Sequence, residues 1–117
     1  MKLKESVIQK NIIEWLNFQP GVFAFRINVQ GVPLHNKSGY RPSPLRGVSD
    51  IIACVNGHFV AIEVKTQKGK LSSYQLDFSD KIINSKGYFV TARSIEDVEK
   101  LLNHLNKFYY VERETSN

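Results

Sequence analysis

The stretch VSDIIACVNGHFVAIEVKT, residues 48–66, decides the fold. Two apolar runs rich in β-branched residues flank the dipeptide Asn56-Gly57, and each run has the length of a strand. Asn-Gly between such runs is the strongest short-range hairpin signal, because both central residues of a type I′ turn need a positive φ. We therefore expect two antiparallel strands joined by a two-residue turn. Both runs are apolar at consecutive positions, which favours central strands covered on both faces.

The turn also determines which side chains face each other. With a two-residue turn at its centre, the hairpin pairs Asp50 directly with Glu63 on one face of the sheet, with Cβ atoms about 4.5–5.5 Å apart. Lys65 points to the same face because side chains alternate along a strand.

Two acids directly opposite each other are destabilising unless something compensates their charge. Lys65 can neutralise one of the two charges, and a divalent cation held by both carboxylates would satisfy the rest. A few hard oxygen ligands with room for waters and phosphate are typical of Mg²⁺ or Mn²⁺ sites. The alternative is that Asp50 caps the strand end while Glu63 and Lys65 form an exposed ion pair on an edge strand.

Around the hairpin, the sequence predicts the order α-β-β-β-α-β-α, a mixed sheet flanked by helices in an α/β sandwich. A helix over 5–17 has one apolar stripe and ends before Pro20 and Gly21. A strand over 22–29 follows, and a second helix runs from Ser72 or Ser73 to about 85, with Gly87 as its C′ residue. The stretch YFVTA, 88–92, is a fourth strand.

The C-terminal part predicts one more helix, opened by a capping box of Ser94 and Asp97. Its apolar face carries Val98, Leu101, Leu102 and Leu105. The tail 106–117 leaves three readings open: a short strand, a partner contact, or frayed chain.

Length and composition limit the function classes. The 117 residues fit a single domain, 1–117, and a net charge of +5 with a pI of about 9.4 favours polyanionic partners such as nucleic acid. No apolar run is long enough to span a membrane, and we expect a cytoplasmic protein. The single cysteine, Cys54, lies in an apolar run and is expected to be a small buried hydrophobe rather than a nucleophile.

The segment 30–47 predicts a long loop, because it has three prolines, three glycines and no periodicity. It contains no acid but carries four basic side chains, which favours a role facing an anion. They are His35, Lys37, Arg41 and Arg46. The alternative is a merely solvated loop.

Taken together, these motifs resemble the PD-(D/E)XK nuclease superfamily, and more closely its virus-type replication–repair (VRR-NUC) branch. The resemblance covers nearly the whole chain. Its elements are an acid early in the first helix, Gly-Val-Ser-Asp at 47–50, Glu-Val-Lys at 63–65, a Gly-Lys-Leu-Ser loop at 69–72, and a glutamine in the next helix. Ser49 stands where the superfamily name has proline, at a position that varies within the superfamily.

The resemblance implies a restriction-endonuclease-like core and a role for each matched residue. Asp50, Glu63 and the backbone carbonyl of Val64 would be metal ligands, for Mg²⁺ with Mn²⁺ able to substitute. Lys65 would position or activate water.

Two further residues have weaker implied roles. Gln75 would orient the lysine or a phosphate, and Glu5 would reach the metal through water or a second ion. Each has a structural alternative: an acid in a first helical turn is stabilised by the helix dipole, and Gln75 could be an ordinary surface residue.

The function implied is a metal-dependent DNA endonuclease, structure-selective in the manner of Holliday-junction resolvases and acting as a homodimer in a prokaryotic or virus-infected cell. Aromatic residues of the tail, 108–110, could contribute to the dimer contact. Basic residues on both sides of the site would hold DNA phosphates: Lys37, Arg41, Arg46, Lys68 and Lys70. The alternatives are a flap, single-strand or restriction-like nuclease on the same fold, or a catalytically idle DNA-binding domain.

Overall fold

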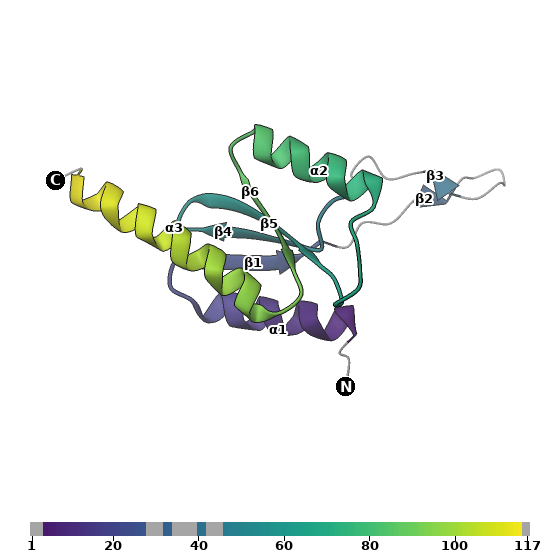
Figure 1. The fold of residues 1–117 in the computed structure, drawn as a ribbon, viewed down its shortest axis with the longest axis horizontal. Helices are drawn as coiled ribbons and strands as arrows, with labels where there is room; N and C mark the ends of the chain where they lie inside the picture. The colour runs from purple at the N-terminus through teal and green to yellow at the C-terminus, as the bar shows by residue number, and fades with distance from the viewer. Residues whose placement is uncertain (1–3, 28–31, 34–39, 42–45, 116–117) are drawn as a thin grey trace.

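The computed structural model describes residues 4–27, 32–33, 40–41 and 46–115. Its elements are α1 (Glu5–Phe18), β1 (Val22–Arg26), β2 (Val32–Pro33), β3 (Tyr40–Arg41), β4 (Ile51–Val55), β5 (His58–Val64), α2 (Ser73–Asn84), β6 (Tyr88–Ala92) and α3 (Ile95–Thr115). The predicted order α-β-β-β-α-β-α is confirmed, with the small β2–β3 pair inserted between β1 and β4 (Figure 1). In the part of the chain that is described, no helix is long and apolar enough to cross a membrane.

One mixed sheet has the order β1-β4-β5-β6. The first two pairings are antiparallel, and β5 pairs with β6 in parallel across the α2 crossover. The predicted hairpin is confirmed: Asn56 and Gly57 have φ values of 49° and 88°, and Ile51 lies opposite Ile62. The register of the sheet is therefore the one that the Asn-Gly turn predicts.

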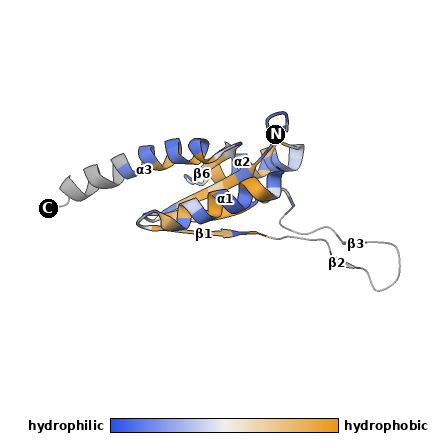
Figure 2. Ribbon diagram, turned by 90° about the horizontal axis from the view of Figure 1, so that it is seen from below, coloured by the Kyte–Doolittle hydropathy of each residue, from blue (hydrophilic) through white to orange (hydrophobic). Residues whose placement is uncertain are grey.

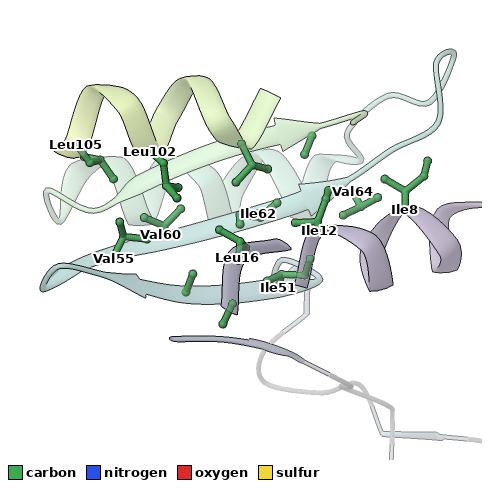
Figure 3. Close-up of a cluster of buried hydrophobic side chains, with 14 residues drawn as sticks. Ile8, Ile12, Leu16, Ile51, Val55, Val60, Ile62, Val64, Leu102 and Leu105 are labelled. Carbon is green, nitrogen blue, oxygen red and sulfur yellow. The ribbon is translucent and has the colours of Figure 1, made fainter. Parts of the chain in front are cut away.

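The core lies between one face of this sheet and the helices α1 and α3 (Figures 1 and 3). The α1 stripe of Ile8, Ile12 and Leu16 packs on the sheet because residues three and four apart share one helix face. Fully burying one such side chain contributes about 1.5–3 kcal/mol. The sheet and α3 supply the rest of the cluster: Ala24, Ile51, Ala53, Val55, Val60, Ile62, Val64, Ala92, Val98, Leu102 and Leu105. Figure 2 shows apolar residues along the sheet and on α1, and polar residues on much of α3.

The expectation of central strands buried on both faces holds for the half of the hairpin next to the acid pair, where Ile52 and Ala61 are 9% and 0% exposed, but not for the half next to the turn. Helix α2 packs over β6 on the face opposite the core, and the side chains on this face of β1 and near the turn remain exposed. Cys54 is exposed there, which corrects its prediction as a buried residue. Phe23 and Phe59, its neighbours across the strands, are 64% and 46% exposed. An apolar run shows that a strand avoids polar side chains but does not show what covers it.

The ends of α2 differ in detail from the prediction. At its start, Ser72 and Gln75 form a complete capping box, with Gln75 N donating to Ser72 Oγ and Ser72 N to Gln75 Oε1. At its end, Lys86 has φ 70° and is the C′ residue, one position before the predicted Gly87. Lys86 N donates to the Ile83 carbonyl and Gly87 N to the Ile82 carbonyl, as in a Schellman motif.

The last helix is longer than the sequence indicated. Helix α3 runs to Thr115, so the backbone of the ambiguous tail is helical rather than a strand. The Asp97 carboxylate accepts the Arg93 N–H at 2.8 Å, one residue before the Ser94 amide that a capping box would use. The strand predicted over 22–29 ends at Arg26, and residues 28 and 29 lie outside the described ranges.

Candidate active site

Asp50 and Glu63 lie at one end of the sheet, where β4 begins and β5 ends. Ile27 N donates to the Asp50 carbonyl at 2.8 Å, which continues the β1–β4 pairing one residue past the strand. Asp50 Oδ2 accepts the Val64 N–H at 2.8 Å, so the carboxylate is held against the β5 backbone. Ile51 and Ile62 point into the core, and Asp50 and Glu63, one residue along each strand, therefore face the α2 side.

Glu63 is a buried acid next to a second carboxylate, so its charged form is strongly disfavoured. Its side chain is 2% exposed, and its Oε1 has no hydrogen-bond partner among the residues described. The pKa of Glu63 is raised to about 9, first by burial and then by the hydrogen bond to Asp50 and the charge of that carboxylate. Lys65 opposes this shift, while Glu5 adds to it. The raised pKa keeps Glu63 protonated at neutral pH in the metal-free protein.

Lys65 is placed by the strand and by the turn that follows it. Its N–H donates to the Ala92 carbonyl at 3.0 Å, which continues the parallel β5–β6 pairing. Gly69 folds back over its aliphatic stem: a Cβ at that glycine would lie 3.3 Å from Lys65 Cδ. The turn is closed by Gly69 N donating to the Thr66 carbonyl at 3.0 Å. This packing leaves few conformations to the lysine stem.

A second contact, which no sequence pattern predicted, also holds this turn. Arg93, which follows β6, donates from its guanidinium to the Thr66 carbonyl. A lone arginine between a strand and a helix carries no sequence signal for such a role, because its partner lies on another segment of the chain.

The two weaker candidates occupy different positions. Glu5, in the first turn of α1, is exposed and close enough to Glu63 to raise its pKa. The side-chain oxygen of Gln75 accepts the Ser72 N–H in the capping box, which gives this residue a structural role and leaves its NH₂ group available. Neither position tests the catalytic role expected for the residue.

Among the basic candidates, Arg46, Lys68 and Lys70 are exposed near the two loops that border the site. The Cζ atom of Arg46 lies 3.9 Å from the centroid of the Tyr74 ring. Lys37 lies outside the described residues, and for Arg41 the description is limited to its backbone in β3.

The donor set fits a hard divalent cation. Two carboxylates on adjacent strands, one with a buried and unpartnered oxygen, are ligands that Mg²⁺ and Mn²⁺ prefer. Within the described ranges, no three His, Cys, Asp or Glu side chains gather closely enough to hold a metal ion, so Glu5 does not join the pair as a direct third ligand. The protein would therefore contribute two carboxylates, with waters and substrate completing the shell.

Known proteins resemble this chain in structure. No protein-family model matches the sequence, and no curated protein matches it. A solved structure described as a VRR_NUC domain is similar, with a TM-score of 0.56 and 21% sequence identity over 86% of this chain and 95% of that chain. The chain has a VRR-NUC-type fold, as the sequence motifs predicted.

Proposed function

We propose that this protein is a divalent-metal-dependent nuclease that hydrolyses DNA phosphodiesters. The observation that carries the proposal is the pair of Asp50 and the buried Glu63, whose pKa is raised and whose Oε1 has no hydrogen-bond partner within the described ranges. The VRR-NUC-type fold supports the same reading. A purely structural site would leave no reason for two acids to face each other in a sheet that is otherwise apolar at this depth.

In this reaction, the acid pair would bind the metal ion and Lys65 would act on the water or the phosphate. Asp50 and Glu63 would hold the cation with the Val64 carbonyl, after Glu63 gives up its proton. A bound divalent cation supplies positive charge against the scissile phosphate. Lys65, its stem held by Gly69, would donate hydrogen bonds to the attacking water or to a phosphate oxygen and stabilise the charge that develops there.

The test is cleavage of labelled DNA in Mg²⁺, Mn²⁺ and Ca²⁺ by the wild type and by Asp50→Asn and Lys65→Met. We expect cleavage in Mg²⁺ and Mn²⁺, and a loss of at least about a hundredfold in either variant. Asp77→Asn is the matched control, because Asp77 is an exposed acid paired with Lys81 on α2. If the Asp50 and Lys65 variants cut DNA as well as the wild type does, these residues do not form the active site. DNA binding without cleavage by wild type in any metal would indicate an idle DNA-binding domain.

For the substrate, we propose branched DNA such as a four-way junction. The net charge of +5 and the exposed basic residues beside the site favour contacts to phosphates, which position a protein on DNA without reading sequence. A panel of junction, flap, duplex and single-stranded substrates separates this proposal from a flap, single-strand or restriction-like nuclease. Equal rates on all four would contradict structure selectivity.

We also propose a homodimer, and the uncovered sheet face supports it. Phe23, Phe25, Cys54 and Phe59 are exposed there and uncharged, and Ile52 and Ala61 in the same cross-strand rows are buried. A two-fold contact sets identical patches against each other, so an uncharged patch suits it. Pairing through the edge of β1 is blocked at Ala24, whose N–H and carbonyl both bond to the Asn17 side chain.

The exposed area is of the right size for this contact. Phe23, Phe25 and Phe59 are 64%, 40% and 46% exposed. Together they leave roughly 300 Å² of ring surface, since each ring offers about 200 Å². A standard interface buries about 800 Å² per partner, of which about 60% is apolar, so the three rings supply more than half of the apolar part.

Light scattering after gel filtration tests the dimer. We expect a dimer for wild type, a monomer for Phe23→Ser and Phe59→Ser, and a dimer for Phe18→Ser, because Phe18 is 85% exposed on α1 away from this face. A monomeric wild type contradicts the proposal. Dissociation by Tyr109→Ser in place of Phe59→Ser would move the contact to the tail.

A further inference from the structure

The segment before β4 is pressed against the first turn of α2. Gly47 has φ 84°, and a Cβ at this position would lie 2.3 Å from the Tyr74 carbonyl oxygen. Such a distance is far shorter than a van der Waals contact, so only glycine allows the two backbone segments to approach each other here. The consequence is that the residue before Gly47 has a fixed position relative to α2.

That preceding residue, Arg46, lies over an aromatic ring. Its Cζ atom is 3.9 Å from the centroid of Tyr74, within the range of a cation–π contact. Tyr74 is 48% exposed, and its side chain makes no hydrogen bond within the described ranges. Within the described ranges, the contact with Arg46 is therefore the specific interaction that the ring makes.

The guanidinium itself is left with its hydrogen-bonding capacity intact. Arg46 is exposed, and none of the described residues accepts a hydrogen bond or forms an ion pair with it, whereas Arg93 uses its guanidinium on the Thr66 carbonyl. Arginine carries five N–H donors in a planar fork that matches the two oxygens of a phosphate. A ring that holds the guanidinium by its face leaves those edge donors free.

The location connects this pair to the proposed chemistry. Arg46 precedes Asp50 by four residues, and Tyr74 precedes Gln75 in the helix that covers the site's side of the sheet. We propose that Arg46, positioned by Tyr74 and Gly47, forms a binding site for one DNA backbone phosphate next to the scissile one. This inference rests on the proposed nuclease function. Tyr74 is a positioning residue in it and does not itself touch the substrate.

The experiment measures DNA affinity in Ca²⁺, by fluorescence anisotropy of a labelled junction across a range of salt concentrations. Arg46→Ala should weaken binding and reduce the salt slope of log K by about one, the loss of one phosphate contact. Lys100→Ala, which removes an equal charge from an exposed position on α3 across the sheet, should change neither. Arg46→Lys should recover the salt slope but not the full affinity, because lysine lacks the planar fork.

Tyr74 is tested by its coupling to Arg46. Tyr74→Ala should weaken binding about two- to fivefold, the usual strength of an exposed cation–π contact, and Tyr74→Phe should bind like wild type. In the Arg46→Ala background, Tyr74→Ala should have no further effect. Tyr74→Leu keeps an apolar side chain without the ring and should behave as Tyr74→Ala, which separates positioning from helix stability.

The possible failures are distinguishable. Wild type that binds and cuts DNA while the Tyr74 and Arg46 single variants match it would overturn this inference and leave the nuclease proposal standing. Effects of Tyr74→Ala and Arg46→Ala that add independently would overturn the positioning role. Wild type that neither binds nor cuts DNA would overturn both proposals together.

Discussion

The raised pKa of Glu63 predicts an unusual pH dependence for the stability of the metal-free protein. Burial and the neighbouring Asp50 raise the pKa of Glu63 from 4.5 to about 9. Between these values the folded protein keeps a proton that the unfolded chain has lost, so the free energy of unfolding falls as pH rises. The decrease should reach roughly 3 kcal/mol between pH 6 and pH 8, because each pH unit in this range changes the free energy of unfolding by a little over 1 kcal/mol.

The assay is urea denaturation in EDTA at pH 6, 7 and 8 for wild type and for Glu63→Gln. Glutamine is neutral at every pH and keeps the shape of the protonated acid, so the variant should lack this contribution. Its stability relative to wild type should therefore increase by roughly 3 kcal/mol over the two pH units. Glu99→Gln, which removes an exposed carboxylate on α3, serves as the matched control. Parallel pH profiles for wild type and Glu63→Gln would refute the reasoning.

Mg²⁺ extends the same prediction, because the cation must displace the proton. The apparent Mg²⁺ affinity should rise with pH up to about 9, by as much as tenfold per unit, and binding should release protons. Saturating Mg²⁺ should accordingly flatten the pH dependence of wild-type stability. Isothermal titration calorimetry in two buffers with different ionisation enthalpies counts the protons released. A pH-independent affinity with no proton release would contradict a protonated Glu63.

Three substitutions outside the acid pair have defined expectations in chemical denaturation at one pH. Lys86→Gly should stabilise the protein by about 1 kcal/mol, because Lys86 has φ 70° and glycine adopts that conformation without a Cβ penalty. Ser49→Ala should be neutral or stabilising by up to about 1 kcal/mol, because the Ser49 hydroxyl is buried without a partner in the described part of the chain. Ile12→Ala should destabilise by about 2–5 kcal/mol, because Ile12 is 0% exposed in the core.

The parts of the fold that the sequence predicted well are those governed by local chemistry. Asn56-Gly57 requires positive φ at both turn positions, and that single requirement determines the register from Val55 back to the position of Asp50. The placement of Lys65 on the same face follows from strand alternation alone. Each of these inferences needs only the residue and its neighbours along the chain.

The parts that could not be predicted depend on contacts between distant segments. The exposure of Cys54 and Phe59 depends on where α2 crosses the sheet, and an apolar run carries no information on that. The contact of Arg46 with Tyr74 joins residues 28 positions apart. The neighbouring Gly47 is the local hint of this contact, but the reason why position 47 requires glycine is visible only in the structure, where α2 packs against it. The Ser-x-x-Gln spacing of Ser72 and Gln75 is a local signature of a capping box, whereas the nuclease resemblance implies a catalytic role for Gln75.

The position of the acid pair within its sheet face explains why its cost in stability and its proposed function go together. The face facing α2 is apolar in the two preceding rows of β4 and β5, which pair Cys54 with Phe59 and Ile52 with Ala61, and becomes acidic only in the last row. One row further back, two carboxylates would lack access to solvent, metal and substrate. One row further out, water would screen them and the pKa of Glu63 would not rise. If the proposed function is right, the last row is where a carboxylate pair would be dehydrated enough to hold a cation strongly and still lie at the end of the sheet, where DNA would reach it. The stability lost to that dehydration should be recovered when Mg²⁺ binds.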